Sequence, residues 1–219
     1  MTPQEIILKT TAFVKETLKG AEGGHDWFHI QRVLINAQTI AATENVDKLV
    51  VALGALLHDI ADAKFYDGDE TVGPRMAKEF LMKIDIAPKI IDQVTYIIEN
   101  VSFKNSLGKG GDKPHPIELQ VIQDADRLDA MGAIGIARAF NYGGFKNREL
   151  YNPEIPPNLN MSKEEYKKSS SPTINHFYEK LLLLKDKFNT RTGSAMAEQR
   201  HRFMLDYLEQ FYGEWGEID

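Results

Sequence analysis

The chain contains no cysteine among its 219 residues. Disulfides and thiolate metal ligands are therefore excluded, so a metal site has to use His, Asp or Glu side chains. No apolar run approaches the roughly 18 residues that a membrane-spanning helix needs, and we expect no membrane partner. Residues 1–15 also lack a basic stretch followed by an apolar core, which is the pattern of an export signal. Together these absences predict a cytoplasmic protein.

Positive charge is scarce as well. Lys and Arg number 26 against 32 Asp and Glu, which gives a net charge of -6. This balance argues against nucleic acid as a partner but leaves room for a local basic pocket that binds a small phosphate ester. The length suits one globular domain. We expect a single domain over residues 1–219, with a long loop excursion at about 141–172.

Strand-type alternation of apolar and polar residues is missing too, and the ordered stretches have the spacing of helices. The sequence therefore predicts an all-α fold. Thr2 to Glu5 form a capping box with proline at the first helical position, and Asp26 and Asp47 suit the starts of two further helices. We expect helices over residues 3–18, 26–44, 48–61, 73–84, 88–100, 117–140, 173–189 and 194–212, with a bend near Gly132 and Gly135. We expect loops over residues 101–116 and 141–171.

His58 and Asp59 stand side by side at the end of the apolar run Leu49 to Ala61. One interpretation is a histidine near a helix C-terminus with a solvated carboxylate beside it. The other is that the imidazole and the carboxylate bind one divalent cation. The dipeptide alone does not choose between these two interpretations.

His29 and Asp126 are the other candidate ligands. His29 faces inward by helical phase beside Val33, either as a hydrogen-bonded core residue or as a ligand. Asp126 lies in a segment that looks core-facing, where an unpaired carboxylate is costly unless a metal, an Arg or a His offsets its charge. Two imidazoles and two carboxylates suit Mn²⁺, Fe²⁺, Co²⁺, Ni²⁺ or Zn²⁺, and they leave coordination positions for water and a substrate oxygen.

Three segments carry these residues: Gly-His-Asp-Trp-Phe-His-Ile-Gln-Arg-Val at Gly24 to Val33, His-Asp-Ile-Ala-Asp at His58 to Asp62, and Asp-Ala-Asp-Arg-Leu-Asp-Ala-Met-Gly-Ala-Ile-Gly at Asp124 to Gly135. Two more are His-Phe-Tyr-Glu-Lys-Leu at His176 to Leu181 and Glu-Gln-Arg-His at Glu198 to His201. Over nearly the whole chain this set resembles the HD-domain metal-dependent phosphohydrolases, above all bacterial single-domain nucleotide pyrophosphohydrolases.

The resemblance implies a single HD-type helical domain whose metal ligands, on several helices, surround a central cleft. The implied ligands are His29, His58, Asp59 and Asp126, the last chosen over Asp124 because the HD ligand is the Asp of the Ala-Asp pair. Between Asp59 and Asp126 the only histidine is His115, so we expect one metal ion and not two. Mn²⁺ is the first choice, with Fe²⁺, Co²⁺, Ni²⁺, Zn²⁺ or Mg²⁺ as alternatives.

The resemblance also implies an enzyme that hydrolyses nucleotides. The expected reaction converts (deoxy)nucleoside triphosphates to monophosphate and pyrophosphate, using metal-activated water. Other phosphohydrolase activities stay open, namely a 5′-nucleotidase, a triphosphohydrolase or a phosphodiesterase. A non-catalytic nucleotide-sensing module and a homodimer stay open too, whereas a mixed-metal oxygenase would need more histidine ligands.

Further site residues follow from position or from the resemblance. Asp62, one helical turn after His58, is a candidate for activating water or protonating the leaving group, and Lys64 for contacting phosphate. His25 and Asp26 either orient His29 or cap its helix. A polyphosphate needs several cations besides the metal. The candidate substrate-binding residues are Arg32, Lys180, Arg200 and His201.

Overall fold

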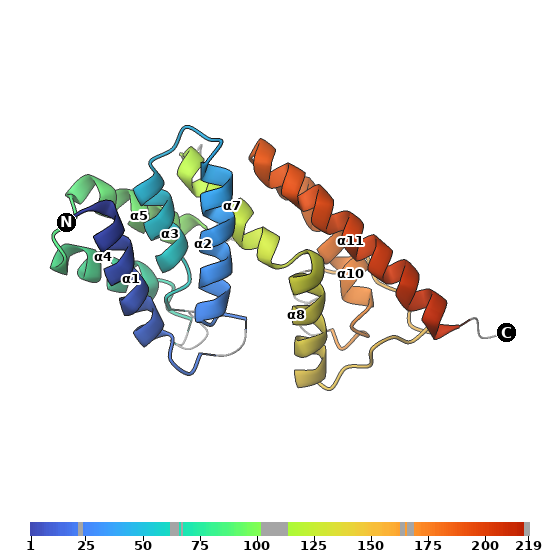
Figure 1. The fold of residues 1–219 in the computed structure, drawn as a ribbon. Helices are drawn as coiled ribbons and strands as arrows, with labels where there is room; N and C mark the ends of the chain where they lie inside the picture. Colours follow the sequence, from blue (N-terminus) through green and yellow to red (C-terminus); the bar gives the residue numbers. More distant parts are fainter. Residues whose placement is uncertain are drawn as a thin grey trace. The chain divides into compact units, whose positions relative to one another are not determined.

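A computed structural model of the chain describes residues 1–21, 24–61, 66, 68–101, 114–162, 165 and 169–216. Over these residues the chain is helical and contains no strand, which confirms the predicted all-α class (Figure 1). The helices are α1 (Pro3–Thr17), α2 (Trp27–Ala41), α3 (Lys48–Leu57), α4 (Val72–Lys83), α5 (Pro88–Asn100), α7 (Ile117–Asp129), α8 (Gly132–Phe145), α10 (Asn175–Glu179), the 3₁₀ helix η2 (Leu181–Lys187) and α11 (Arg191–Trp215). None of these helices is long and apolar enough to cross a membrane.

By the contacts among its residues the chain divides into two compact units, Met1–Asp126 and Arg127–Asp219. Helices α1 to α5 belong to the first unit, and α8 to α11 belong to the second. Helix α7 begins in the first unit and ends in the second. The expectation of one domain over residues 1–219 stays a prediction.

Helix α3 lies at the centre of the first unit. It packs against α1, α2 and α5, and every residue from Val50 to Leu57 is buried. The sequence predicts this burial, because a helix that is apolar nearly all round has no face to give to water. On another side of the unit, the stacked rings of Phe13 and Phe80 join α1 to α4 with their centroids 4.0 Å apart. The first unit is thus built around a buried helix whose last residue precedes His58.

The predicted helix starts are confirmed by their caps. The Thr2 hydroxyl accepts from the Glu5 backbone N–H, and the Glu5 carboxylate accepts from the Thr2 backbone N–H, as in a capping box. Asp26 accepts from the backbone N–H of His29 at 2.9 Å, and Asp47 accepts from the first N–H groups of α3. Each cap satisfies a donor that has no partner within its helix. The Asp26 cap also places His29 in the first turn of α2.

Two predicted helices end earlier than expected. Helix α3 stops at Leu57 and not near Ala61, and the His58 ring that follows it lies 2.9 Å, through Nδ1, from the Ala55 carbonyl oxygen of the last turn. The helix expected over residues 117–140 is split into α7 and α8, because Gly132 has φ +68°, a left-handed conformation that favours glycine. The sequence pattern located this break but indicated only a bend.

In the second unit the predicted helix over residues 173–189 is in fact the short α10 followed by the 3₁₀ helix η2. Helix α8 extends to Phe145, so the loop expected from residue 141 begins later. Helix α11 packs against α8 and η2. Aromatic side chains fill the spaces between them: Phe177 is fully buried and stacks on Tyr207, and the ring of Tyr151 meets rings near the end of α11.

Candidate metal centre

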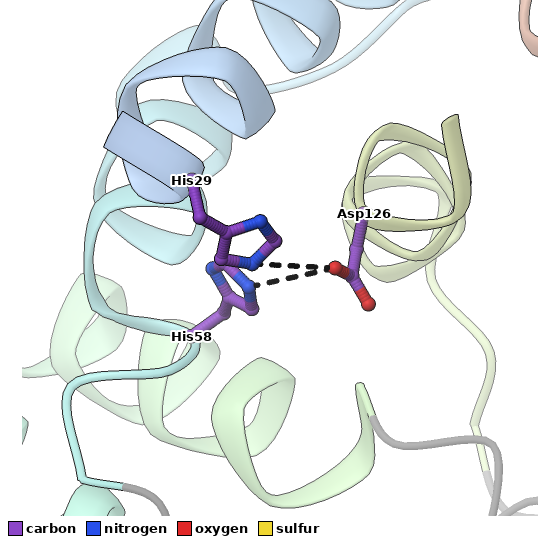
Figure 2. A group of neighbouring side chains, drawn as sticks. All are labelled: His29, His58 and Asp126. Atoms are coloured by element: carbon purple, nitrogen blue, oxygen red, sulfur yellow. Dashed lines mark ion pairs between the residues drawn. The ribbon is translucent and has the colours of Figure 1, made fainter. Parts of the chain in front are cut away.

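Two imidazoles and a carboxylate of the first unit come together from α2, the end of α3 and α7. His29 lies in the first turn of α2, His58 immediately follows α3, and Asp126 lies near the end of α7. Figure 2 shows the two rings facing the Asp126 carboxylate. An Asp126 oxygen lies 3.5 Å from His29 Nε2 and 3.9 Å from His58 Nε2. The ligand atoms of all three residues lie within 4.8 Å of one another.

This spacing fits a shared metal ion. Imidazole nitrogens and carboxylate oxygens bind first-row divalent ions at about 2.0–2.2 Å, so neighbouring ligands of one ion are about 3–4 Å apart. The hydrogen bond between His58 Nδ1 and the Ala55 carbonyl oxygen requires the proton on Nδ1, because the carbonyl can only accept. His58 Nε2 then keeps its lone pair on the side of Asp126, and the backbone holds the ring in place.

Burial differs between the ligands. The side chains of His29 and His58 are 3% and 4% exposed, whereas the Asp126 side chain is 42% exposed. The imidazoles therefore form the closed side of the group, and the carboxylate lies on its solvent side. A metal held in this way is accessible to a small molecule from solution, as a hydrolytic site requires.

Two contacts fix α7 beside the helices that carry the histidines. Gly54 lies one turn before His58, and Ile122 lies one turn before Asp126. The end of the Ile122 side chain occupies the space that a Cβ atom at Gly54 would fill, so glycine leaves room for this contact between α3 and α7. Near the same level the Asn36 side chain on α2 donates to the Ala125 carbonyl oxygen on α7 at 3.2 Å.

Asp59, the fourth predicted ligand, has a partner of its own. Its Oδ2 lies 2.5 Å from His25 Nδ1, and its side chain is 20% exposed. Burial raises the pKa of Asp59, but the hydrogen bond from His25 and the charges of His58, His25 and His29 outweigh burial, so the pKa lies below its ordinary value. Asp59 is therefore an ionised carboxylate among imidazoles. His25 contacts Asp59, while Asp26 is the residue that holds His29, through its backbone.

The remaining predicted residues of the first unit are placed as follows. Asp62 and Lys64 lie outside the described residues. Arg32 lies on α2 three residues after His29 and is partly buried. Among the described residues, the group of potential ligands contains Asp126 and does not contain Asp124, whose side chain is fully buried.

The other predicted substrate-binding residues belong to the second unit. Lys180 is exposed at the junction of α10 and η2. The Arg200 guanidinium donates to the Leu128 carbonyl oxygen, and its pKa is lowered by burial although Asp129 counters this effect. His201 is buried on α11, and burial lowers its pKa too. The role of each of these residues in binding substrate stays a prediction.

Sequence reasoning missed Asn36. It is buried on the face of α2 that also carries His29, Val33, Ala37 and Ile40. A single amide on an otherwise apolar helix face, seven residues after a candidate ligand, is the signal that indicates such a position.

Comparison with known proteins places the chain in a family. Residues 27–131 match the family described as HD domain. The Bacillus subtilis protein YpgQ is 37% identical over 209 residues, which are 94% of this chain and 92% of YpgQ. Protein L803 of Acanthamoeba polyphaga mimivirus is 28% identical over 217 residues, covering 86% of this chain and 88% of L803.

Solved structures agree with this placement. An HD-superfamily hydrolase from Bacillus thuringiensis matches with a TM-score of 0.79 and 41% identity over 98% of both chains. The structure of Bacillus subtilis YpgQ in complex with ADP matches with a TM-score of 0.76 and 36% identity, over 98% of this chain and 97% of YpgQ. The chain belongs to the HD-domain family, and this membership supports the expected class of enzyme, a metal-dependent phosphohydrolase.

Proposed function

We propose that this enzyme hydrolyses (deoxy)nucleoside triphosphates to monophosphate and pyrophosphate. The observation that carries the proposal is the group of His29, His58 and Asp126, whose ligand atoms have the spacing of ligands to one metal ion. A nucleotide substrate is supported by the relative YpgQ, whose structure is a complex with ADP. The same complex favours a nucleotide-sensing module as the second candidate, since binding alone does not require hydrolysis.

In the proposed site, His29, His58, Asp59 and Asp126 hold one divalent ion, with Mn²⁺ as the first choice. Such an ion supplies Lewis-acid activation of water near neutral pH when it is bound. The Ala55 carbonyl oxygen and His25 hold His58 and Asp59 in place. We assign proton transfer to Asp62 and phosphate contact to Lys64.

The same proposal assigns the polyphosphate to Arg32, Lys180, Arg200 and His201. The partner is a small-molecule nucleotide and not nucleic acid, in keeping with the net charge of -6. A cytoplasmic location and a homodimer complete the proposal, and light scattering of the purified protein tests the assembly.

Product analysis tests the reaction. The protein is incubated with Mn²⁺ and a panel of NTPs, dNTPs and monophosphates, and the products are separated by anion-exchange chromatography. Monophosphate plus pyrophosphate, absent in the His58→Ala/Asp59→Ala double variant, is the expected result. Asp92→Asn is the matched control, because Asp92 is an exposed carboxylate on α5.

Other outcomes lead elsewhere. Nucleoside plus tripolyphosphate, or nucleoside plus phosphate, would show that a different bond is cleaved. Either result would overturn the pyrophosphohydrolase assignment. Saturable nucleotide binding without turnover across the panel would favour the sensor.

A further inference from the structure

Asn36 is a buried polar residue that the proposed reaction does not use. It is 6% exposed and lies on α2 between the apolar residues that pack against the rest of the first unit. It is seven residues after His29, so the two side chains leave α2 on the same side, two turns apart. Burying an amide is costly unless its hydrogen bonds are made, so its partner is informative.

One of its partners is the backbone next to a proposed ligand. The Asn36 side-chain amide donates to the Ala125 carbonyl oxygen at 3.2 Å, across 89 residues of sequence. Ala125 directly precedes Asp126 and is fully buried. The hydrogen bond therefore connects the helix that carries His29 to the residue before Asp126.

The Ala125 carbonyl oxygen does not need this bond to be satisfied. Helix α7 continues to Asp129, so the same oxygen lies opposite the backbone N–H four residues later. A carbonyl has two lone pairs and can accept both bonds. The hydrogen bond from Asn36 is thus additional to the one within α7, and it restricts the position of α7 relative to α2.

We propose that Asn36 is a positioning residue, which sets the separation of the Asp126 carboxylate from the His29 imidazole through its hydrogen bond to Ala125. The inference rests on the proposed metal site. The Gly54–Ile122 contact is an apolar one between α3 and α7, and Gln123 of α7 donates to the Asn100 carbonyl oxygen on α5. The Asn36 hydrogen bond joins α7 to α2, the helix of His29, and it has a preferred length and direction. Removing a residue that orients a metal ligand costs about 10- to 100-fold in metal affinity or activity.

Co²⁺ binding to the purified full chain tests the proposal without relying on turnover. The dissociation constant is measured by calorimetry, and the visible absorption of bound Co²⁺ reports its coordination. In Asn36→Leu, which keeps the size of the side chain and removes its donor, we expect the dissociation constant to rise by about 10- to 100-fold and the spectrum to change. Asp126→Ala is the reference for the loss of a ligand.

Val14→Ala is the matched control for stability. Val14 is fully buried on α1 and lies in the apolar core of the same unit. We expect this variant to lower the melting temperature and to keep both the wild-type spectrum and, within about twofold, the wild-type Co²⁺ affinity. If Asn36→Leu does not fold, Asn36→Ser takes its place, since serine is smaller and too short to reach Ala125.

The outcomes separate the two proposals. Failure of the wild type to bind Co²⁺ would overturn the metal site itself. Wild-type affinity and spectrum in a folded Asn36 variant would overturn the positioning role alone. So would a loss of affinity that follows melting temperature equally in the Asn36 and Val14 variants, since that result describes stability and not position.

Discussion

The two units differ in how their carboxylates are partnered. In the first unit, His29 and His58 point toward the same Asp126 oxygen, so three ligand-type groups meet at one place. In the second unit, the buried Asp129 carboxylate has a cation of its own, because Arg138 lies 2.5 Å from it. Pairing of opposite charges offsets the cost of burial within the protein, whereas two imidazoles that share one carboxylate oxygen form a set that a cation completes.

Two arginines of the second unit bind the end of α7. Arg138 also donates to the Asp129 carbonyl oxygen, and Arg200 donates to that of Leu128. The last carbonyl groups of a helix have no partner within it and carry partial negative charge, so cations stabilise this end. These arginine contacts stabilise the end of α7, whereas the groups at the candidate metal centre converge on one another.

The largest effect is expected when one of the three residues that meet in the first unit is removed. We expect His58→Ala to lower kcat/KM by at least about a thousandfold on any substrate that the wild type hydrolyses, since a metal supplies several kcal/mol of stabilisation. The second unit should unfold as in the wild type. Each unit holds one of the two tryptophans, so fluorescence of Trp215 in a Trp27→Phe background reports the second unit. Full activity in His58→Ala would remove His58 from the metal site.

Breaking a charge pair in the second unit should act on stability and not on metal binding. Asp129 is 1% exposed, and Arg138→Met removes the guanidinium that faces it. We expect a loss of about 3 kcal/mol in the free energy of unfolding, measured by urea denaturation, because the buried carboxylate loses its ion pair with Arg138. Asp129→Leu/Arg138→Met should recover most of this loss. A double variant as unstable as the single one would mean that the loss came from packing and not from charge.

The smallest of these effects depends on pH. Burial, together with the nearby charges of Lys180 and Arg148, lowers the pKa of His176 from 6.5 to about 4. The folded protein therefore keeps His176 neutral, while the unfolded chain takes up a proton below pH 6.5. The contribution of His176 to the free energy of unfolding is therefore fully present above pH 6.5, and it is lost as the pH falls toward 4.

Comparison with His176→Gln isolates that contribution. Over the range from pH 6.5 to 4, we expect the wild type to lose on the order of 2 kcal/mol more of its unfolding free energy than His176→Gln does. Urea denaturation followed by Trp215 fluorescence measures the difference. Parallel pH profiles would show that His176 titrates in the folded protein as it does in the unfolded chain.

Much of the fold follows from local sequence. The caps at Thr2, Asp26 and Asp47 and the apolar run of α3 predict where helices start and which one is buried, because these features depend on residues within a few positions of one another. The ends of helices are predicted less well. Helix α3 ends at Leu57 although the apolar run continues to Ala61, and the break between α7 and α8 requires the left-handed Gly132.

The sequence by itself determined the helical class, the family resemblance and the choice of His29, His58, Asp59 and Asp126 as candidate ligands. Tertiary structure alone decided that His29, His58 and Asp126 meet, that His25 faces Asp59, and that Asn36 reaches the backbone beside Asp126. The physical reason is the separation in sequence between the residues that interact. Helix starts and burial are set by side chains one or two turns apart, whereas the spacing between α2, α3 and α7 is set by packing between residues tens of positions apart.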